Sequence, residues 1–179
     1  RNAEGLLNLY VEKLIQDQEG YIWAGTGNGV FRYDGVKFTK RRGLDGWVNN
    51  LELDPTGRPV TLHRGKICRD NGVAFECRDL DTEVWRNSTL RPIAVEPDGS
   101  VLIASLNLYR VSVQDWRAAW GKAGGKIALK SVLTRKQVGG EILAVVRRPE
   151  DGVYWMSCGM ELCRMGTNGE IRHFGKADG

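Results

Sequence analysis

Short apolar runs alternate with turn residues along the chain, and the order in which they follow one another is repeated. Residues 10–15, 93–95 and 142–146 are rich in β-branched and other apolar side chains, and each run leads to a turn rich in Asp, Pro and Gly. After each turn come a second apolar run, a short hairpin containing Gly, a third run, a second turn and a fourth run. The second turns at Asp34-Gly35, Asn71-Gly72 and Asn168-Gly169 carry the residues typical of type I′ turns. This order predicts units of four antiparallel strands and excludes arrays of helices.

Glycines at equivalent positions indicate that there are four units. Gly20, Gly57, Gly99 and Gly152 each close the first turn of a unit, at steps of about 37, 42 and 53 residues. This range is typical of propeller blades and of some helical arrays, and the strand pattern within each unit favours the propeller. A single four-stranded sheet cannot bury both of its faces, whereas sheets packed face to face around an axis can. We therefore predict an all-β fold, a β-propeller or partial propeller with blades at residues 5–42, 43–87, 88–135 and 136–175.

The third unit is longer than the others because of an insertion at residues 114–125. Asp115 as an N-cap, the Ala-rich content and the Gly-Gly pair at 124–125 predict a helix of one or two turns between the third and fourth strands. Trp116 and Trp120 are four residues apart, so they share one face of this helix. That face packs either against its own blade or against another domain.

The clearest unit resembles a repeat of known proteins. Its motif is Asp17-x-x-Gly20-Tyr21-Ile22-Trp23-x-Gly25-Thr26-x-x-Gly29-Val30-x-Arg32-Tyr33-Asp34-Gly35. The motif is similar to the two-component regulator propeller repeat, most closely over residues 5–38, fairly over 141–174 and weakly in the two middle units. The resemblance implies a periplasmic sensor propeller of seven blades, in a bacterial membrane protein whose output is a histidine kinase, a transcription-factor module or a diguanylate cyclase.

Four blades are about half of such a propeller, so the resemblance implies that the chain is a fragment of a larger sensor domain. The remaining blades or a second chain would then cover the sheet faces that a partial propeller leaves exposed. Closure of the four blades into a ring of their own is the alternative.

Composition narrows the classes of partner. The sequence is 41% hydrophobic and 27% charged, and no apolar run approaches the ~18 residues of a membrane-spanning helix, so we expect no membrane contact from this segment. The net charge of +4 is small and dispersed, and the longest basic block is residues 40–42. This pattern argues against a nucleic-acid partner.

The four cysteines form two pairs of neighbours. Cys158 and Cys163 face each other if their hairpin turns at residues 160–161, whereas Cys68 and Cys77 oppose each other only if the loop between their strands has four residues. Two hairpin disulfides in an oxidising periplasm agree with the family resemblance. Four buried free thiols in a cytosolic protein are the alternative.

Charged residues divide between the two ends of the strands. The loops that join second to third strands and fourth to first strands carry most of the basic residues, and the other turns carry Asp and Glu. A cationic rim would attract an anionic ligand such as an acidic oligosaccharide. Alternatively, the acidic residues serve the turns through backbone hydrogen bonds. The candidate ligand-binding residues are Arg41, Arg42, Trp47, Arg64, Arg91, Arg135 and Lys136.

Repeated residues within the blades have structural interpretations. We expect Trp23 and Trp155, which are equivalent, to lie in the core between blades, and Arg32 and Arg164 to bridge to an acid of a neighbouring blade.

No constellation of catalytic residues stands out, and no cofactor is expected. The sequence has no Cys-x2-Cys motif, and its histidines, His63 and His173, fall in different blades, so we expect no metal site. Streptogramin lyases and sugar lactonases are built on similar blades, which keeps an enzyme as an alternative. The favoured hypothesis is a non-enzymatic sensor of an extracellular ligand, and a structural interaction propeller is the second.

Overall fold

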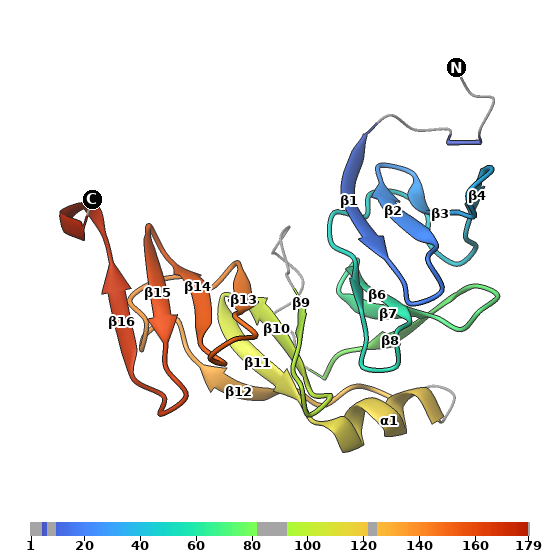
Figure 1. The fold of residues 1–179 in the computed structure, drawn as a ribbon. Coiled ribbons are helices and arrows are strands. Elements are labelled where there is room, and N and C mark those ends of the chain that lie inside the picture. Colours follow the sequence, from blue (N-terminus) through green and yellow to red (C-terminus); the bar gives the residue numbers. More distant parts are fainter. Residues whose placement is uncertain (1–4, 7–9, 82–92, 122–124, 179) are drawn as a thin grey trace. The chain divides into compact units, whose positions relative to one another are not determined.

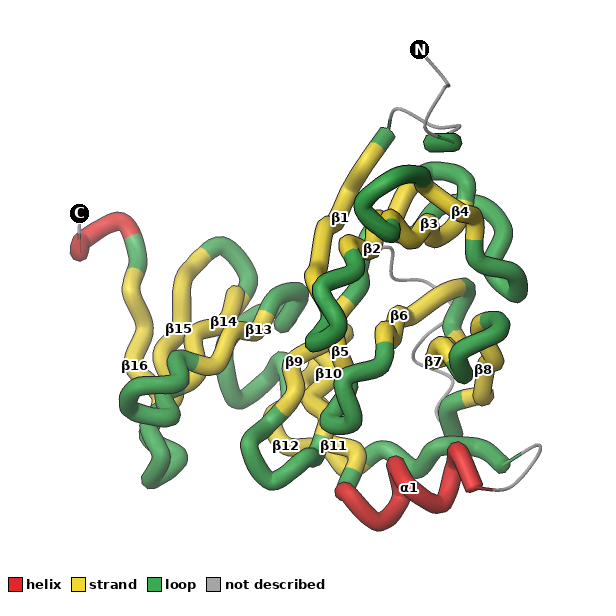
Figure 2. Tube along the Cα trace, turned by 45° about the vertical axis from the view of Figure 1, so that its right-hand side comes forward, coloured by secondary structure: helices red, strands yellow, loops and turns green. Residues whose placement is uncertain are grey.

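The structure is a computed structural model, and it describes residues 5–6, 10–81, 93–121 and 125–178. The chain forms two compact units, Arg1–Leu80 with Ala119–Ile127 and Asp81–Ala118 with Ala128–Gly179. Each unit contains two antiparallel four-stranded sheets (Figures 1 and 2). In every sheet the strands pair in the order in which they occur along the chain, as in propeller blades. The prediction of an all-β chain of four propeller blades is confirmed.

The first unit contains the first and second blades. The strands of the first blade are β1 (Val11–Gln16), β2 (Ile22–Thr26), β3 (Gly29–Tyr33) and β4 (Phe38–Lys40). Those of the second are β5 (Glu52–Leu53), β6 (Pro59–His63), β7 (Lys66–Asp70) and β8 (Phe75–Asp79). The facing sides of the two sheets share one apolar cluster that includes Trp23, Leu51 and Phe75. Trp23 therefore lies in the core between blades, as predicted.

The second unit contains the third and fourth blades. The strands of the third blade are β9 (Ile93–Val95), β10 (Val101–Ser105), β11 (Asn107–Val111) and β12 (Lys130–Leu133). Those of the fourth are β13 (Val145–Arg147), β14 (Tyr154–Cys158), β15 (Glu161–Met165) and β16 (Ile171–Phe174), followed by the 3-10 turn η3 (Lys176–Asp178). Their shared core includes Leu102, Leu108 and Met156. Trp155, in contrast, is half-buried and stacks on Phe174 of its own blade.

The repeated glycines have the same backbone conformation in all four blades. Gly20, Gly57, Gly99 and Gly152 have φ values of 89°, 78°, 85° and 72°. In each case the glycine N–H donates to the carbonyl three or four residues earlier, which closes the turn between the first and second strands. Glycine adopts this left-handed conformation without steric cost, so the repeat glycines are the residues that set the blade period.

The turns between third and fourth strands differ from the type I′ turns expected from the sequence. Gly35 and Gly72 have positive φ, but Asp34 and Asn71 do not, and a type I′ turn requires both. The Asp34 carboxylate accepts hydrogen bonds from the N–H groups of residues 36 and 37, and the Asn71 side chain accepts the equivalent pair. These side-chain bonds favour four-residue loops.

The predicted helix is present between β11 and β12 as α1 (Val113–Gly121), but its N-cap lies three residues earlier than the expected Asp115. Ser112 is the N-cap, because its hydroxyl accepts the N–H of Asp115 and donates to the Asp115 carboxylate. Trp116 is buried, whereas Trp120 lies against the second blade, with its ring 5.2 Å from the Arg78 guanidinium carbon. The face of the helix that carries Trp120 therefore contacts a blade other than its own.

Both predicted disulfides are present. Cys68 and Cys77 are direct cross-strand partners, since residues 71–74 form a four-residue loop. The hairpin of the other pair turns one residue earlier than predicted, so that Cys158 faces Glu161 and Cys163 faces Met156. The disulfide Cys158–Cys163 is therefore diagonal, with the two Cα atoms 5.9 Å apart.

Within the described ranges, the structure has no helix with the length and apolar character needed to cross a membrane.

Candidate functional site

Two aromatic side chains are exposed at the end of the first blade where the β2–β3 turn and the β4–β5 connection meet. The exposed fractions of Tyr10 and Trp47 are 68% and 53%, and their ring centroids are 5.8 Å apart. The Gly27 N–H donates to the Tyr10 carbonyl at 3.1 Å, and the Val48 N–H donates to the Thr26 carbonyl at 2.8 Å. These backbone bonds hold both aromatic residues beside the β2–β3 turn. We call this end of the first unit the loop face.

Charged side chains lie along the β4–β5 connection just before Trp47. Arg64 lies in the β6–β7 turn with a φ of 50°, and its Nη2 is 3.4 Å from the position of a Cβ at Gly46. The Arg64 guanidinium thus lies beside the residue that precedes Trp47. Lys40 forms an ion pair with Asp45 at 2.9 Å on the same connection. The lysine charge is therefore compensated.

His63 lies next to Arg64, and its environment favours the neutral imidazole. Burial lowers the pKa of His63, and the charge of Arg64 lowers it further. Hydrogen bonds with the backbone of Trp47 and of Asp45 act in the opposite direction but do not cancel these effects. The ring therefore contributes to holding the Trp47 connection in place.

Of the predicted ligand-binding residues, the structure brings Trp47 and Arg64 together. Arg41 faces the other way: its Nη2 and Nε donate to Asp70 Oδ1 at 2.7 and 3.1 Å, and its side chain is only 12% exposed. Arg41 is thus a bridge between the blades and not a free cation of the loop face. The side chain of Arg42 is exposed, and its carbonyl accepts the Phe75 N–H.

The remaining predicted residues lie elsewhere. Arg91 falls outside the described residues. Arg135 and Lys136 are exposed on the β12–β13 connection of the second unit, where the Arg135 N–H donates to Asn107 Oδ1.

The acidic turn residues serve the backbone, which is the alternative interpretation of their placement. The N–H groups of Thr56 and Arg58 donate to Asp54 Oδ1, and that of Ser100 donates to Asp98 Oδ1. Bonds from the Ser100 N–H and hydroxyl lower the pKa of the Asp98 carboxyl. Because these carboxylates accept hydrogen bonds from turn amides, their positions are explained by turn geometry. No separate role for an acidic rim is needed to account for them.

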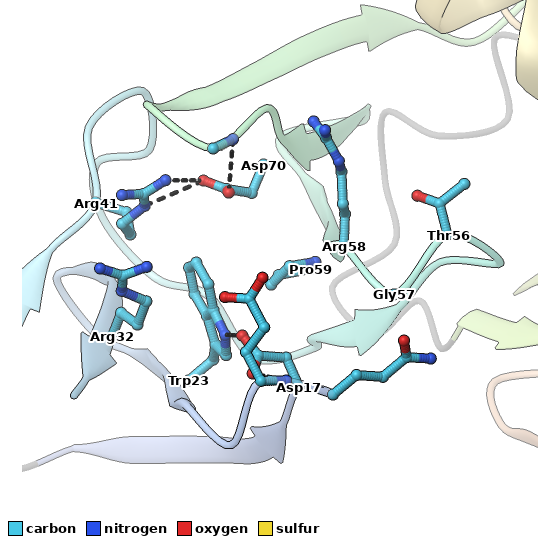
Figure 3. A pocket seen from close by; sticks show the side chains of 12 residues that line it. Asp17, Trp23, Arg32, Arg41, Thr56, Gly57, Arg58, Pro59 and Asp70 are labelled. Atoms are coloured by element: carbon cyan, nitrogen blue, oxygen red, sulfur yellow. Dashed lines mark hydrogen bonds and ion pairs between the residues drawn. The ribbon is translucent and has the colours of Figure 1, made fainter. Parts of the chain in front are cut away.

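A cleft of about 260 Å³ lies between the first and second blades, at the end opposite the loop face (Figure 3). Its wall comes from the β1–β2, β5–β6 and β7–β8 turns, from the start of the β4–β5 connection and from residues of β2, β3, β6 and β7. The lining residues are Asp17, Gln18, Glu19, Trp23, Arg32, Arg41, Thr56, Gly57, Arg58, Pro59, Asp70 and Gly72.

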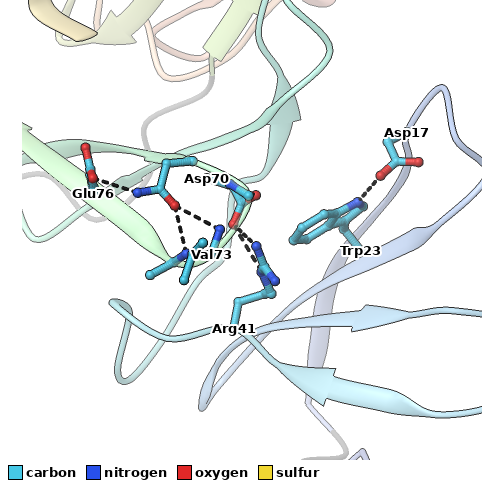
Figure 4. Close-up of polar contacts among 9 residues, drawn as sticks. Asp17, Trp23, Arg41, Asp70, Val73 and Glu76 are labelled. Atoms are coloured by element: carbon cyan, nitrogen blue, oxygen red, sulfur yellow. Dashed lines mark hydrogen bonds and ion pairs between the residues drawn. The ribbon is translucent and has the colours of Figure 1, made fainter. Parts of the chain in front are cut away.

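Two of the acids in the cleft are already paired (Figure 4). Asp17 Oδ2 accepts the Trp23 indole N–H at 2.7 Å, and its Oδ1 accepts two turn amides. Asp70 Oδ1 accepts both bonds from Arg41, and its Oδ2 accepts the Gly72 N–H. Neither carboxylate has an oxygen without a donor.

Arg32 differs from the expectation that it bridges to an acid of a neighbouring blade. Its guanidinium carbon lies 4.3 Å from the centroid of the Tyr21 ring and 5.8 Å from that of Trp23. Among the described residues it forms no ion pair. The sequence identifies Arg32 as a repeated residue. It does not show that the nearby carboxylate of Asp17 already accepts hydrogen bonds from Trp23 and from two turn amides.

His173 comes close to the disulfide of the fourth blade. Its Nδ1 lies 3.4 Å from Cys163 Sγ and 2.9 Å from Glu161 Oε2, and Nδ1 and the two sulfur atoms of Cys158 and Cys163 are all within 4.8 Å of one another. The fold thus brings His173 next to a cysteine pair with which the sequence pattern did not associate it. The sulfurs are joined in a disulfide, which offers no thiolate to a metal ion.

The sequence matches no family model and no curated protein. The fold, however, is similar to that of solved propellers. The extracellular domain of BT4673, assigned as a hybrid two-component system of B. thetaiotaomicron, has a TM-score of 0.70 and 14% identity, over 92% of this chain and 25% of that chain. The extracellular domain of BT3049, assigned to the same class in the same organism, has a TM-score of 0.69 and 14% identity, over 97% and 25%.

Propeller enzymes are also similar in fold. A catalytically inactive virginiamycin B lyase from Staphylococcus aureus, solved with quinupristin, has a TM-score of 0.65 and 14% identity, over 94% of this chain and 57% of that chain. The chain thus spans about a quarter of the length of the sensor domains and a little over half of the lyase. At these identities the comparisons establish the fold, and they identify the chain as a set of four β-propeller blades.

Proposed function

We propose that the chain is part of an extracytoplasmic sensor propeller of a bacterial membrane signalling protein, and that it binds an extracellular anionic saccharide at the loop face. The repeat motif, the two disulfides and the similarity to extracellular domains of signalling proteins support the sensor assignment. The role is recognition and not catalysis. The remaining blades of the sensor, or a second chain, are the expected neighbours of this segment.

The observation that carries the proposed ligand is the exposed pair of Tyr10 and Trp47, with the Arg64 guanidinium beside Gly46, the residue before Trp47. An exposed tryptophan exchanges unfavourable contact with water for contact with the apolar face of a sugar ring. A nearby guanidinium binds a carboxylate in bidentate geometry. Aromatic faces together with an arginine therefore fit an acidic oligosaccharide better than a neutral one.

Calorimetric titration of the protein with oligogalacturonate and with a neutral galactose oligosaccharide of equal length tests this proposal. We expect the acidic probe to bind, Trp47→Ala to weaken binding about tenfold, and Arg64→Gln to weaken it and reduce its salt dependence. Arg117→Gln, which removes an exposed cation of α1, is the matched control and should leave binding unchanged. Equal binding of the two probes, or unchanged affinity in both loop-face variants, would overturn the proposed ligand.

The similarity to a streptogramin lyase favours a second candidate, a propeller enzyme. Incubation of the protein with quinupristin, followed by mass spectrometry of the products, distinguishes the two. Cleavage would replace the sensor proposal by a lyase. Absence of cleavage together with absence of saccharide binding would leave the structural interaction propeller.

A further inference from the structure

Each blade carries an arginine on its third strand, opposite an apolar residue of its second strand. The register gives the four pairs Trp23 with Arg32, Val60 with Arg69, Leu102 with Arg110, and Trp155 with Arg164. Because these positions are equivalent in the repeat, the blades serve as internal controls for one another.

In the second and third blades this arginine is paired with the acid that directly follows the first strand. Arg69 Nε lies 2.6 Å from Asp54 Oδ2, and Arg110 Nε lies 2.7 Å from Glu96 Oε2. Both acids are buried. The repeat therefore has an arginine–carboxylate pair built into the blade.

In the first blade the pair is broken. The equivalent acid, Asp17, accepts the Trp23 indole N–H and two turn amides, because this blade has a tryptophan where the second and third blades have aliphatic side chains. Arg32 is left stacked on the rings of Tyr21 and Trp23, half-buried and without a carboxylate among the described residues. A partly desolvated guanidinium in this position retains its capacity to bind a carboxylate.

The arginine released in this way faces the cleft between the first and second blades (Figure 3). Arg58 contributes a second cation from the β5–β6 turn; its side chain is exposed and forms no ion pair with a described residue. Arg41, Asp17 and Asp70 also line the cleft but are already satisfied by the bonds described above. The charged groups that remain for a ligand are therefore the two guanidinium groups and the exposed carboxylate of Glu19.

We infer that this cleft is a second ligand site, independent of the loop face, that binds the carboxylate group of a single small molecule through Arg32. The ligand's carboxylate pairs with Arg32 as Asp54 pairs with Arg69 and Glu96 with Arg110 in the next two blades. Glu19 favours a ligand that also carries a hydroxyl or ammonium donor. The cleft volume of about 260 Å³ lies just below the ~300–1,000 Å³ typical of drug-sized pockets, which suits one sugar acid or one amino acid.

Two kinds of molecule carry this chemistry, a sugar acid and an α-amino acid. Titration followed by NMR or calorimetry should therefore use galacturonate and glutamate, with galactose as the neutral control. We expect at least one of the two carboxylates to bind and galactose not to bind. Preference between the two distinguishes the source of the carboxylate.

The variants separate this site from the loop face. Arg32→Gln should weaken carboxylate binding about tenfold or more, since hydrogen bonds to charged groups are the strong ones, and Arg58→Gln should weaken it less. Arg164→Gln, the same change at the equivalent position of the fourth blade, is the matched control and should leave affinity unchanged, as should Trp47→Ala. Thermal unfolding of Arg32→Gln verifies that the variant is folded.

The inference is overturned if neither carboxylate binds, if galactose binds as well as galacturonate, or if folded Arg32→Gln retains the parent affinity. Loss of oligogalacturonate binding in Trp47→Ala with carboxylate binding intact would support both sites. Unchanged oligogalacturonate binding in Trp47→Ala, together with weakened carboxylate binding in Arg32→Gln, would remove the loop face and leave the cleft.

Discussion

The junction between the first two blades and the junction between the last two use the same repeat positions in different ways. In the first unit, Arg41 from the β4–β5 connection reaches across to Asp70 of the second blade. In the second unit, Glu96 of the third blade keeps Arg110 as its partner and also accepts the hydroxyl of Tyr154 from the fourth blade. Burial of Tyr154 and its bond to Glu96 raise the pKa of the Tyr154 phenol, so it stays a donor at neutral pH.

The difference shows how one substitution within a repeat can change a structural pair into a candidate binding group. Where the acid at the end of the first strand is free to pair, as Glu96 is, the junction is closed by the blade's own arginine and a neighbouring tyrosine. In the first blade, Trp23 donates its indole N–H to Asp17, so Arg32 faces a cleft. Arg41 then joins the two blades instead.

The largest effect is expected at the first junction. Arg41→Met should destabilise the protein by about 3 kcal/mol, because it leaves the buried carboxylate of Asp70 without its partner. Chemical denaturation measures the loss. Lys40→Met is the control, because its partner Asp45 is 87% exposed and such a pair contributes almost nothing. Equal stability of the two variants would show that Arg41 does not join the blades.

At the second junction, Tyr154→Phe should cost about 1–2 kcal/mol, because buried Glu96 loses one donor but keeps Arg110 and Ser100. Tyr33→Phe, which removes an exposed hydroxyl bonded to the Gly35 carbonyl, should change stability by much less. A loss as large as that of Arg41→Met would mean that Tyr154 is as important to its junction as the ion pair is to the other.

Trp23→Phe should convert the first blade toward the arrangement of the second. Removing the indole N–H frees Asp17 Oδ2, so Arg32 can pair with it as Arg69 pairs with Asp54. We expect carboxylate binding at the cleft to weaken about tenfold, a difference of about 1.4 kcal/mol. Titration with the same carboxylate probes measures this change. Unchanged affinity in a folded variant would contradict the competition between Trp23 and Arg32 for Asp17.

The smallest effect is expected at the first turn of the fourth blade, where Arg148 stands in place of the acid. Its bond lowers the pKa of the Asp151 carboxyl from 3.8 to about 2. A lowered carboxyl pKa adds stability that is fully present above pH 4 and is lost as the pH falls toward 2. Asp151→Asn should therefore slightly reduce the free energy of unfolding at neutral pH. It should also reduce the decrease of that free energy between pH 4 and 2, measured by denaturation at several pH values. The same pH dependence of stability in the variant and the parent would show that the exposed Arg148–Asp151 pair does not persist in solution.

The strand pattern and the turn glycines were sufficient to predict the blades, because both are local. Apolar alternation sets the strands, and glycines such as Gly20 and Gly152 set the turns through their own backbone conformation. The pairing of the cysteines followed from their place in single hairpins. The exact register at Cys158 did not, because one residue more or less in a tight turn changes the partner without changing the pattern.

The sequence alone determined which residue types recur, and only the tertiary structure decided which of them are already satisfied. Arg32 and Arg41 are both arginines beside turns, yet one stacks on aromatic rings and the other joins two blades. The choice depends on which carboxylate lies within hydrogen-bonding distance and whether another donor has taken it. Such competition involves atoms from strands that are far apart along the chain, so no local pattern records its outcome.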